Sequence, residues 1–435
     1  MAIVQALPAA PPSAPSARRD TGIDFIRALC VVGVVLLHAI MVGVTVVDGA
    51  PVFENASDGT GWIAPLSWVL QVMPLFFVIG GFSGLLAYRR LRAGGASALG
   101  FLSARVHRLL RPAVVTIAVV GVALAVLTLL GVPADLIAVA GFRYSQPLWF
   151  LGVFLLCQVL LPAMVWLHDR APLRTIGALT AVAVAVDLVR GTTGAEAIGF
   201  LNLAFIWLAL QQLGFFLADG RIDALPRRIR VAAIAGAGGL LVSLFLVGAY
   251  SPDLIANINP PTAALLLVGV VHTGLLSLHR ERIGRVSGHA VTAAFTSFVT
   301  RRTMTVYLWH MPVLLAMAGL TAVAALTTDA VLPALDSPEW WLARPLWLLS
   351  ALALTAAVAV AVDRFEREPA PLGTRSRGRL VAAALLGLSG VVLLLVVGTS
   401  VTTAVVAVAL LLAALRLART TSPAPARVAA VAAPA

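Results

Sequence analysis

The chain has 435 residues, of which 60% are hydrophobic and 11% are charged. A soluble protein carries about a quarter charged residues, so the composition excludes a soluble globular domain and predicts a polytopic membrane protein. The formal net charge is +12, and all 31 residues counted as Lys or Arg are arginine. They stand between apolar runs, which argues against a nucleic-acid-binding surface. Arginine-only usage with abundant Ala, Val and Leu is typical of a high-GC bacterial genome.

The two ends of the chain differ from the rest in composition. Residues 1–21 are rich in Pro, Ala and Ser, without the basic and then apolar stretch of a signal peptide. They predict a disordered cytoplasmic tail, and residues 418–435 predict another. Residues 22–417 then form one membrane domain in which no strict internal repeat is visible.

Apolar runs of about 15–25 residues recur along this domain and predict an all-α bundle of about 10–12 transmembrane helices. The predicted spans are residues 23–47, 62–87, 113–133, 149–167, 175–189, 200–218, 231–250, 263–279, 303–326, 346–362, 380–397 and 401–416. Only "GTS" separates the last two, which could instead form one re-entrant hairpin. Residues 287–300 have the length of a short interfacial helix.

Charges alternate between successive loops. Arginines concentrate in every second loop, at residues 18–19, 89–111, 170–174, 221–230, 280–302 and 364–379. The opposite loops hold only Arg143, Arg190 and Arg344, and are instead acidic. By the positive-inside rule both termini are predicted to be cytoplasmic.

The first predicted span carries three ionisable side chains. Asp24 and Arg27 are one helical turn apart and can pair. Arg27 and His38 are eleven residues apart, close to three turns, so both lie on one face about 16 Å apart along the axis. A neutral intramembrane imidazole could accept a proton from a hydroxyl nucleophile. The structural alternatives are a snorkelling arginine and a histidine that bonds to a neighbouring helix.

Five short segments occur in an order that matches one family. They are the Arg27-to-His38 spacing, "MPLFFVIGGFSG" (73–84), "RVHRLLRP" (105–112), "PLWFLGVFL" (147–155) and "TVYLWHMPV" (305–313). Together they resemble the acyltransferase 3 family of integral-membrane O-acyltransferases and O-acetylases. Gly80 stands where the family usually has Ser, so no hydroxyl role is expected there.

The resemblance implies a cytosolic acyl-CoA donor, with acetyl as the expected acyl group, and an acceptor hydroxyl reached from the far side or within the membrane. The acceptors would be sugars of the cell envelope, glycolipids or secreted natural products. His38 would be the catalytic base, and Arg27 would organise the donor end. The family pattern selects Arg105 and Arg108 for the phosphates of coenzyme A, and spacing adds Arg111. A loop on this side of the membrane would be basic in any case.

Three further side chains are predicted to line the substrate pocket. Tyr307 and His310 share a helix face through their i,i+3 spacing, and Trp149 begins a later span. His168 sits in a basic loop and is expected to have no chemical role. Interhelical hydrogen bonds explain the other intramembrane polar residues equally well, namely Gln71, Gln211, Gln212 and His272.

The sequence predicts no metal and no bound cofactor. Rossmann, Walker and HExxH patterns are absent, and Cys30 and Cys157 lie in apolar runs without metal-ligand spacing. The predicted partners are acyl-CoA, a hydroxyl-bearing acceptor and the lipid bilayer of a bacterial inner membrane. The main alternative is a secondary transporter with about twelve spans, which inverted repeats and broken helices would favour, and none is visible. The other alternative is a non-catalytic, flippase-like or scaffold protein.

Overall fold

The computed structural model describes residues 20–328 and 330–420. Most of the two predicted tails, residues 1–19 and 421–435, therefore lies outside the described residues, as does Asp329 of one acidic loop. The helices and strands are α1 (Thr21–Met41), β1 (Val42–Val47), β2 (Ala50–Asn55), α2 (Ile63–Leu70), α3 (Met73–Ala93), α4 (Ala98–Leu129), α5 (Ala134–Ser145), η1 (Gln146–Leu148), α6 (Trp149–Arg170), α7 (Pro172–Thr193), η2 (Glu196–Leu201), α8 (Asn202–Ala218), α9 (Arg227–Leu246), α10 (Ala264–Leu278), α11 (Arg280–Ser287), α12 (Ala290–Arg301), α13 (Thr303–Thr328), α14 (Pro338–Val362), α15 (Arg364–Arg367), α16 (Arg377–Val397) and α17 (Val401–Ala418).

The predicted all-α membrane bundle is confirmed. Among the described residues, eleven helical segments are long and apolar enough to cross a membrane, and α10 is a shorter apolar helix. Together they correspond to the twelve predicted spans. The last two spans are separate helices, α16 and α17, because the chain turns at Gly398 with a φ of +83°. The short helix expected at residues 287–300 is α12.

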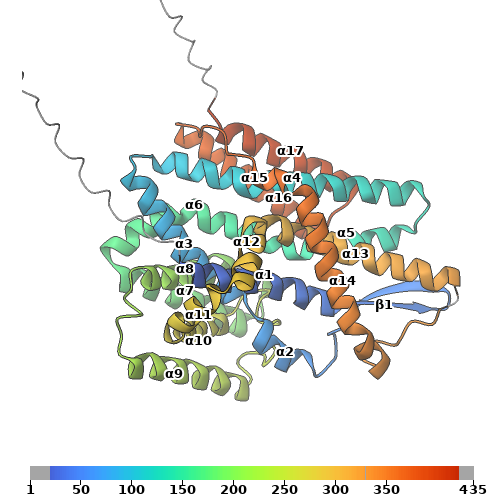
Figure 1. The fold of residues 1–435 in the computed structure, drawn as a ribbon, viewed down its shortest axis with the longest axis horizontal. Helices are drawn as coiled ribbons and strands as arrows, with labels where there is room; N and C mark the ends of the chain where they lie inside the picture. The colour runs from blue at the N-terminus through green and yellow to red at the C-terminus, as the bar shows by residue number, and fades with distance from the viewer. Residues whose placement is uncertain (1–19, 329, 421–435) are drawn as a thin grey trace, which may run out of the picture.

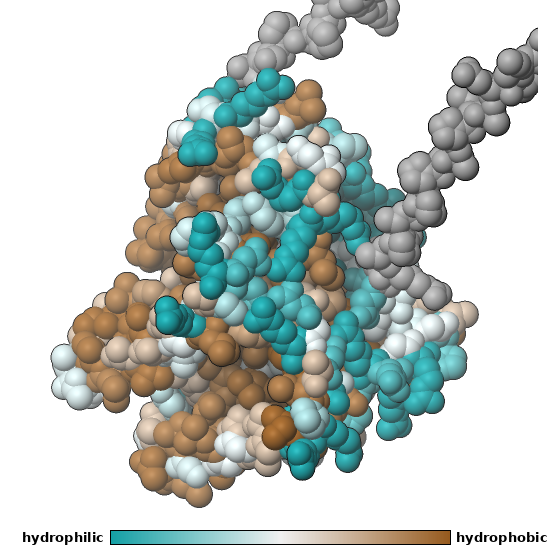
Figure 2. Space-filling model, turned by 90° about the vertical axis from the view of Figure 1, so that its left-hand side faces the viewer, coloured by the Kyte–Doolittle hydropathy of each residue, from teal (hydrophilic) through white to brown (hydrophobic). Residues whose placement is uncertain are grey.

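The molecule has two distinct ends. Most long helices run side by side along the horizontal direction of Figure 1, with the β1–β2 hairpin at one end and the α3–α4 turn at the other. Figure 2 faces the second end, where hydrophilic residues gather between hydrophobic flanks. We call the end with the β1–β2 hairpin the hairpin end, and the end with the α3–α4 turn the arginine-rich end. Ion pairs join elements at the arginine-rich end, namely Arg89–Asp219, Arg111–Glu368, Arg280–Asp20 and Arg302–Asp363.

The first span ends earlier than predicted. Helix α1 stops at Met41, and β1 then pairs antiparallel with β2. Asp48 and Gly49 connect the strands with φ of +50° and +74°, the conformation that a two-residue hairpin turn requires. Hydropathy alone extended the span to residue 47, but the sequence "VGVTVV" is rich in β-branched residues, which favour a strand.

The third span begins earlier than predicted. Helix α4 starts at Ala98 rather than near residue 113, with Ser97 as its N-cap and Pro112 inside the helix. The serine hydroxyl accepts a hydrogen bond from the Gly100 amide, which satisfies one of the free N–H groups of the first turn. The arginines of residues 105–111 therefore project from a helix and not from a loop.

Two spans are broken, which the sequence did not reveal. The second span is interrupted at Gln71 and Val72, between α2 and α3, and Pro74 follows the break. Because the ring of a proline conflicts with the carbonyl four residues earlier, Pro74 disfavours a continuous helix through Leu70. The fourth predicted span belongs to a longer segment, Ala134–Arg170, in which α5 changes to the short 3-10 helix η1, which contains Pro147, before α6 begins.

Glycines bring α3 and α8 into close contact. A Cβ atom on Gly81 would lie 2.2 Å from the Gln211 carbonyl oxygen, and one on Gly214 would lie 2.0 Å from the Val78 carbonyl oxygen. Neither helix could approach the other this closely with a larger residue at the crossing. The pairing fixes the face of α3 that reaches the centre of the bundle.

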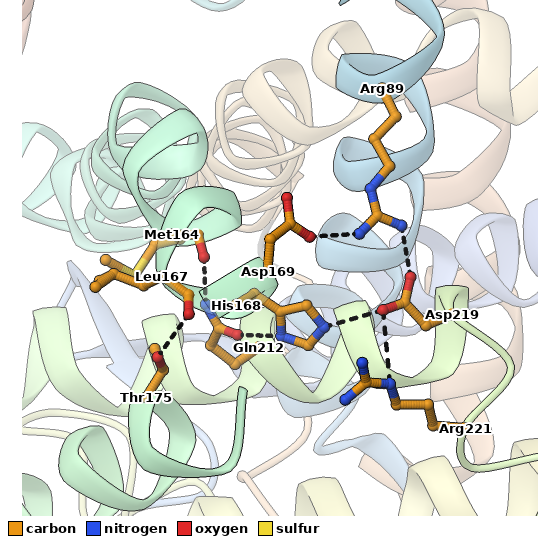
Figure 3. A network of polar contacts seen from close by, with 9 residues as sticks. All are labelled: Arg89, Met164, Leu167, His168, Asp169, Thr175, Gln212, Asp219 and Arg221. Carbon is orange, nitrogen blue, oxygen red and sulfur yellow. Dashed lines mark hydrogen bonds and ion pairs between the residues drawn. The ribbon is translucent and has the colours of Figure 1, made fainter. Parts of the chain in front are cut away.

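A polar network connects α3, α6 and α8 at the arginine-rich end (Figure 3). His168 of α6 is fully buried, with Nδ1 2.8 Å from Gln212 Oε1 and Nε2 3.2 Å from Asp219 Oδ2. Arg89 of α3 bridges Asp219 and Asp169. His168 thus joins α6 to α8, and it lies in the last turn of α6 and not in the loop expected from the sequence.

Candidate active site

Two neighbouring cavities lie between helices α1, α3, α6 and α13. The first, of about 110 Å³, is lined by His38, Met41, Gln71, Trp149 and Tyr307 among others, and we call it the His38 cavity. The second, of about 100 Å³, lies toward the arginine-rich end and is lined by Arg27, Ser83, Arg105, Arg108 and Gln158 among others. We call it the arginine cavity. Phe76 and Thr303 line both cavities, so the two are adjacent.

One face of α1 runs along both cavities. Arg27 lines the arginine cavity, and Val31, Val34 and His38 follow at intervals of four, three and four residues and line the His38 cavity. This is the spacing of one helix face, as the sequence predicts. At 1.5 Å per residue, Arg27 and His38 are about 16.5 Å apart along the axis.

Arg27 is held by two neighbours. Its guanidinium lies 3.1 Å from Asp24 Oδ1, the pairing predicted from the one-turn spacing, and also donates a hydrogen bond to Ser83 Oγ of α3. Asp24 is itself buried. A fixed arginine at the rim of the cavity presents a positive charge in one position instead of many.

His38 and His310 lie against each other. Their ring centroids are 4.9 Å apart. His38 Nδ1 lies 2.8 Å from the Val34 carbonyl oxygen, which can only accept, so this nitrogen carries the proton and Nε2 keeps its lone pair. His310 Nδ1 is bonded in the same way to the Tyr307 carbonyl, and its Nε2 is buried without a partner among the described residues. His38 thus has the tautomer that a proton acceptor needs.

The broken fourth span supplies an aromatic wall of the His38 cavity. Tyr307 donates a hydrogen bond from its hydroxyl to the Pro147 carbonyl oxygen at 2.6 Å, where η1 meets α6. Its ring packs edge-on against Phe150, with centroids 4.8 Å apart. Trp149 stacks on Trp207 of α8. The break therefore places Trp149 and Phe150 beside His38.

The structure separates the three predicted donor-binding arginines. Arg105 and Arg108 line the arginine cavity, and the Arg105 guanidinium lies 4.9 Å from the centre of the Phe101 ring. Arg111 is not among the residues that line either cavity, and pairs with the Glu368 carboxylate at 3.1 Å. Within the described residues, only Arg105 and Arg108 of this group can meet a ligand that Arg27 also meets.

Sequence reasoning missed three polar residues of this region. Ser83 lies three residues after Gly80, the position where the family usually has Ser, and it holds Arg27. Thr303, at the start of α13, lines both cavities. Gln158, in the apolar run "LLCQVLL", lines the arginine cavity. A lone amide inside an apolar helix was the signal that could have found it.

Comparison with known families decides the class of protein. The family model described as an acyltransferase domain, that of the acyltransferase 3 family, matches residues 20–364. The chain belongs to the acyltransferase 3 family. No curated protein and no solved structure matches the chain in the corresponding comparisons.

Membership in the acyltransferase 3 family makes the chain a multi-pass membrane acyltransferase, as the sequence predicts. The matched range contains both cavities and every predicted site residue. Of the three residues predicted to line the substrate pocket, Tyr307 and Trp149 line the His38 cavity, whereas His310 lines neither cavity and instead packs against His38. The broken spans, which could also occur in a transporter, here shape the cavity of an acyltransferase. Within residues 20–328 and 330–420, no group of three or more His, Cys, Asp or Glu side chains could hold a metal ion.

Proposed function

We propose that this acyltransferase moves an acyl group, acetyl by resemblance to its family, from a cytosolic acyl-CoA to a hydroxyl of an acceptor. The observation that carries the proposal is the pair of adjacent cavities along one face of α1, with arginines in one and a histidine in the other. The reaction forms an ester and releases coenzyme A.

The donor would enter at the arginine-rich end. Arg105 and Arg108 would bind its phosphates, because guanidinium groups form strong charge-assisted bonds with phosphate oxygens. Arg27 would bind nearer to the membrane interior. The distance of about 16.5 Å along α1 from Arg27 to His38 is of the same order as an extended pantetheine arm. The thioester would then lie in the His38 cavity.

His38 would act as the general base. Its Nε2 would take the proton of the acceptor hydroxyl while the oxygen attacks the thioester carbonyl. A carbon–oxygen bond forms, the carbon–sulfur bond breaks, and the proton passes from His38 to the departing thiolate. Cys30 and Cys157 line neither cavity, which favours direct transfer over a cysteine-linked intermediate.

The acceptor would approach from the hairpin end. There the His38 cavity is mostly apolar, and two of its polar side chains already use their donor groups within the protein: Gln71 donates to the Leu254 carbonyl and Tyr307 to the Pro147 carbonyl. A free sugar would leave its hydroxyl groups without partners in such a site. Of the acceptors in the family, glycolipids and natural products with an apolar part therefore fit better.

The test is acyl-CoA turnover by membranes that contain the protein. Changing His38 to Ala should lower turnover by about 10²–10⁴-fold, the usual contribution of a general base. His272→Ala is the matched control, because His272 lies within α10 and lines neither cavity. Normal turnover in His38→Ala membranes would overturn the assignment of the base.

The proposed location is a bacterial inner membrane with both termini cytoplasmic. The support is the alternation of arginine-rich and acidic loops, together with ion pairs that gather at one end of the bundle. In this orientation the arginine cavity faces the cytosolic pool of acyl-CoA.

A further inference from the structure

Gln158 of α6 is a buried amide without a protein partner. Its side chain is 2% exposed, and its Oε1 atom is buried without a hydrogen bond to any described residue. Its Nε2 makes no hydrogen bond to a described residue either. Burying an amide in this state is unfavourable, so a group of this kind calls for an explanation.

The surroundings of Gln158 point to a ligand. The residue lines the arginine cavity together with Phe154 of the same helix and with Gly80 and Ser83 of α3. The hydroxyl of Ser83 already accepts a bond from Arg27. The unsatisfied amide therefore faces a space that a second molecule can enter.

Two neighbouring glutamines show what a structural amide looks like in this bundle. Gln211 donates from Nε2 to the Cys157 carbonyl oxygen at 3.1 Å, although its Oε1 is also buried without a partner among the described residues. Gln212 bonds to both Met164 and His168. Neither lines the His38 cavity or the arginine cavity. Gln158 differs from both, because no helix–helix contact uses its amide.

The position of Gln158 fits the middle of the donor. Phe150, Phe154 and Gln158 are spaced by four residues and share one face of α6. Trp149 lines the His38 cavity, and nine residues, about 13.5 Å, separate it from Gln158 along the helix. A donor that reaches from Arg105 to His38 must pass this face.

We propose that Gln158 binds an amide of the pantetheine arm of the acyl donor. A pantetheine arm carries amides between its phosphates and its thioester, and an amide offers both an N–H donor and a C=O acceptor. Such a pair satisfies the glutamine whichever way its own amide is turned. This subsite rests on the proposed use of acyl-CoA as the donor.

The test compares Gln158→Leu with Gln211→Leu in the purified full-length protein. Two probes are titrated: coenzyme A, which carries the arm, and adenosine 3′,5′-bisphosphate, which lacks it. Gln158→Leu should weaken the binding of coenzyme A by about tenfold, since a paired amide is lost, and leave the bisphosphate unchanged. Gln211→Leu should change neither affinity.

Thermal unfolding without ligand provides a second readout. Gln158→Leu should be at least as stable as the wild type, because an unsatisfied buried group is removed, whereas Gln211→Leu loses a bond and should be less stable. Equal binding of coenzyme A by the wild type and Gln158→Leu overturns the subsite, as does an equal loss with both probes. If the wild type binds neither probe, the acyl-CoA assignment itself fails.

Discussion

At the residue scale, His310 is the neighbour that fixes the His38 ring. Its imidazole packs 4.9 Å from that of His38, while its Nδ1 is committed to the Tyr307 carbonyl. In His310→Asn the new amide can still donate to that carbonyl, but the space beside His38 is left partly empty. We expect kcat to fall about 10–100-fold with little change in the KM for acyl-CoA, because a small displacement of a catalytic group is costly.

Steady-state kinetics on membranes, together with the thermal midpoint, checks this prediction. The control is His272→Asn, which should keep wild-type kcat because His272 lines neither cavity. A His310→Asn variant that is stable and fully active would reduce His310 to a packing residue. A variant that raises KM alone would assign it to donor binding instead.

The arginines of α4 give a second residue-scale prediction, with a control inside the same helix. Arg105→Ala and Arg108→Ala should each weaken acyl-CoA binding by about 10–100-fold at low salt, as expected for a lost bond between charged groups. Arg111→Ala should stay within about twofold, because Arg111 pairs with Glu368 outside the cavity. Titrations at increasing salt should also show a shallower dependence in the first two variants. Equal losses in all three would mean a general effect of charge at this surface.

At the scale of elements, the ends of α3, α6 and α8 are joined through Asp219. Partial burial by itself raises its pKa, but hydrogen bonds from Arg89 and His168 hold the pKa of the carboxyl below its usual value of 3.8. A depressed folded-state pKa contributes stability above the unfolded value, and that contribution is lost as pH falls through the folded one. Asp219→Asn should therefore lower the thermal midpoint at pH 5–7 and approach the wild type below about pH 4.

Thermal unfolding of the detergent-solubilised protein across this range is the measurement. Asp169→Asn is the matched control, since Asp169 also pairs with Arg89 but its side chain is 52% exposed and should matter less. The expected loss for Asp219→Asn is about 1.5–3 kcal/mol, the value of a hydrogen bond to a charged group. If the thermal midpoint of Asp219→Asn stayed equally far below that of the wild type at acidic pH, a contact other than the ionised carboxylate would stabilise these helix ends.

Helical elements were predictable where hydropathy and spacing agree, and not where backbone geometry decides. The face that joins Arg27 to His38 follows from helical periodicity alone. The breaks before Pro74 and at Pro147 do not, because a proline inside an apolar run can be tolerated, as Pro112 is within α4. Gln158 was missed for a related reason. From the sequence alone, an intramembrane amide is expected to bond to a neighbouring helix. Only the structure shows that the amide of Gln158 has no such partner.

At the scale of the whole molecule, the proposed mechanism would join an entrance at one end to a reaction centre within the helix bundle. Arg105 and Arg108 would mark the entrance, and Phe76 and Thr303 line both the arginine cavity and the His38 cavity. The other border of the His38 cavity is apolar and lies toward the hairpin end. Donor and acceptor would thus meet at His38 from opposite directions, so the mechanism depends on which end faces the cytosol.

Labelling of single introduced cysteines tests that orientation. Ala93→Cys lies at the arginine-rich end and Asp58→Cys lies beyond β2 at the hairpin end, both at exposed positions. The native thiols of Cys30 and Cys157 are 2% and 1% exposed and should not react. With an impermeant thiol reagent, intact cells should label Asp58→Cys, and Ala93→Cys should react only after lysis, because arginine-rich loops stay in the cytosol. The reverse pattern would place Arg105 and Arg108 outside the cell, away from any pool of acyl-CoA, and the proposed donor would have to be abandoned.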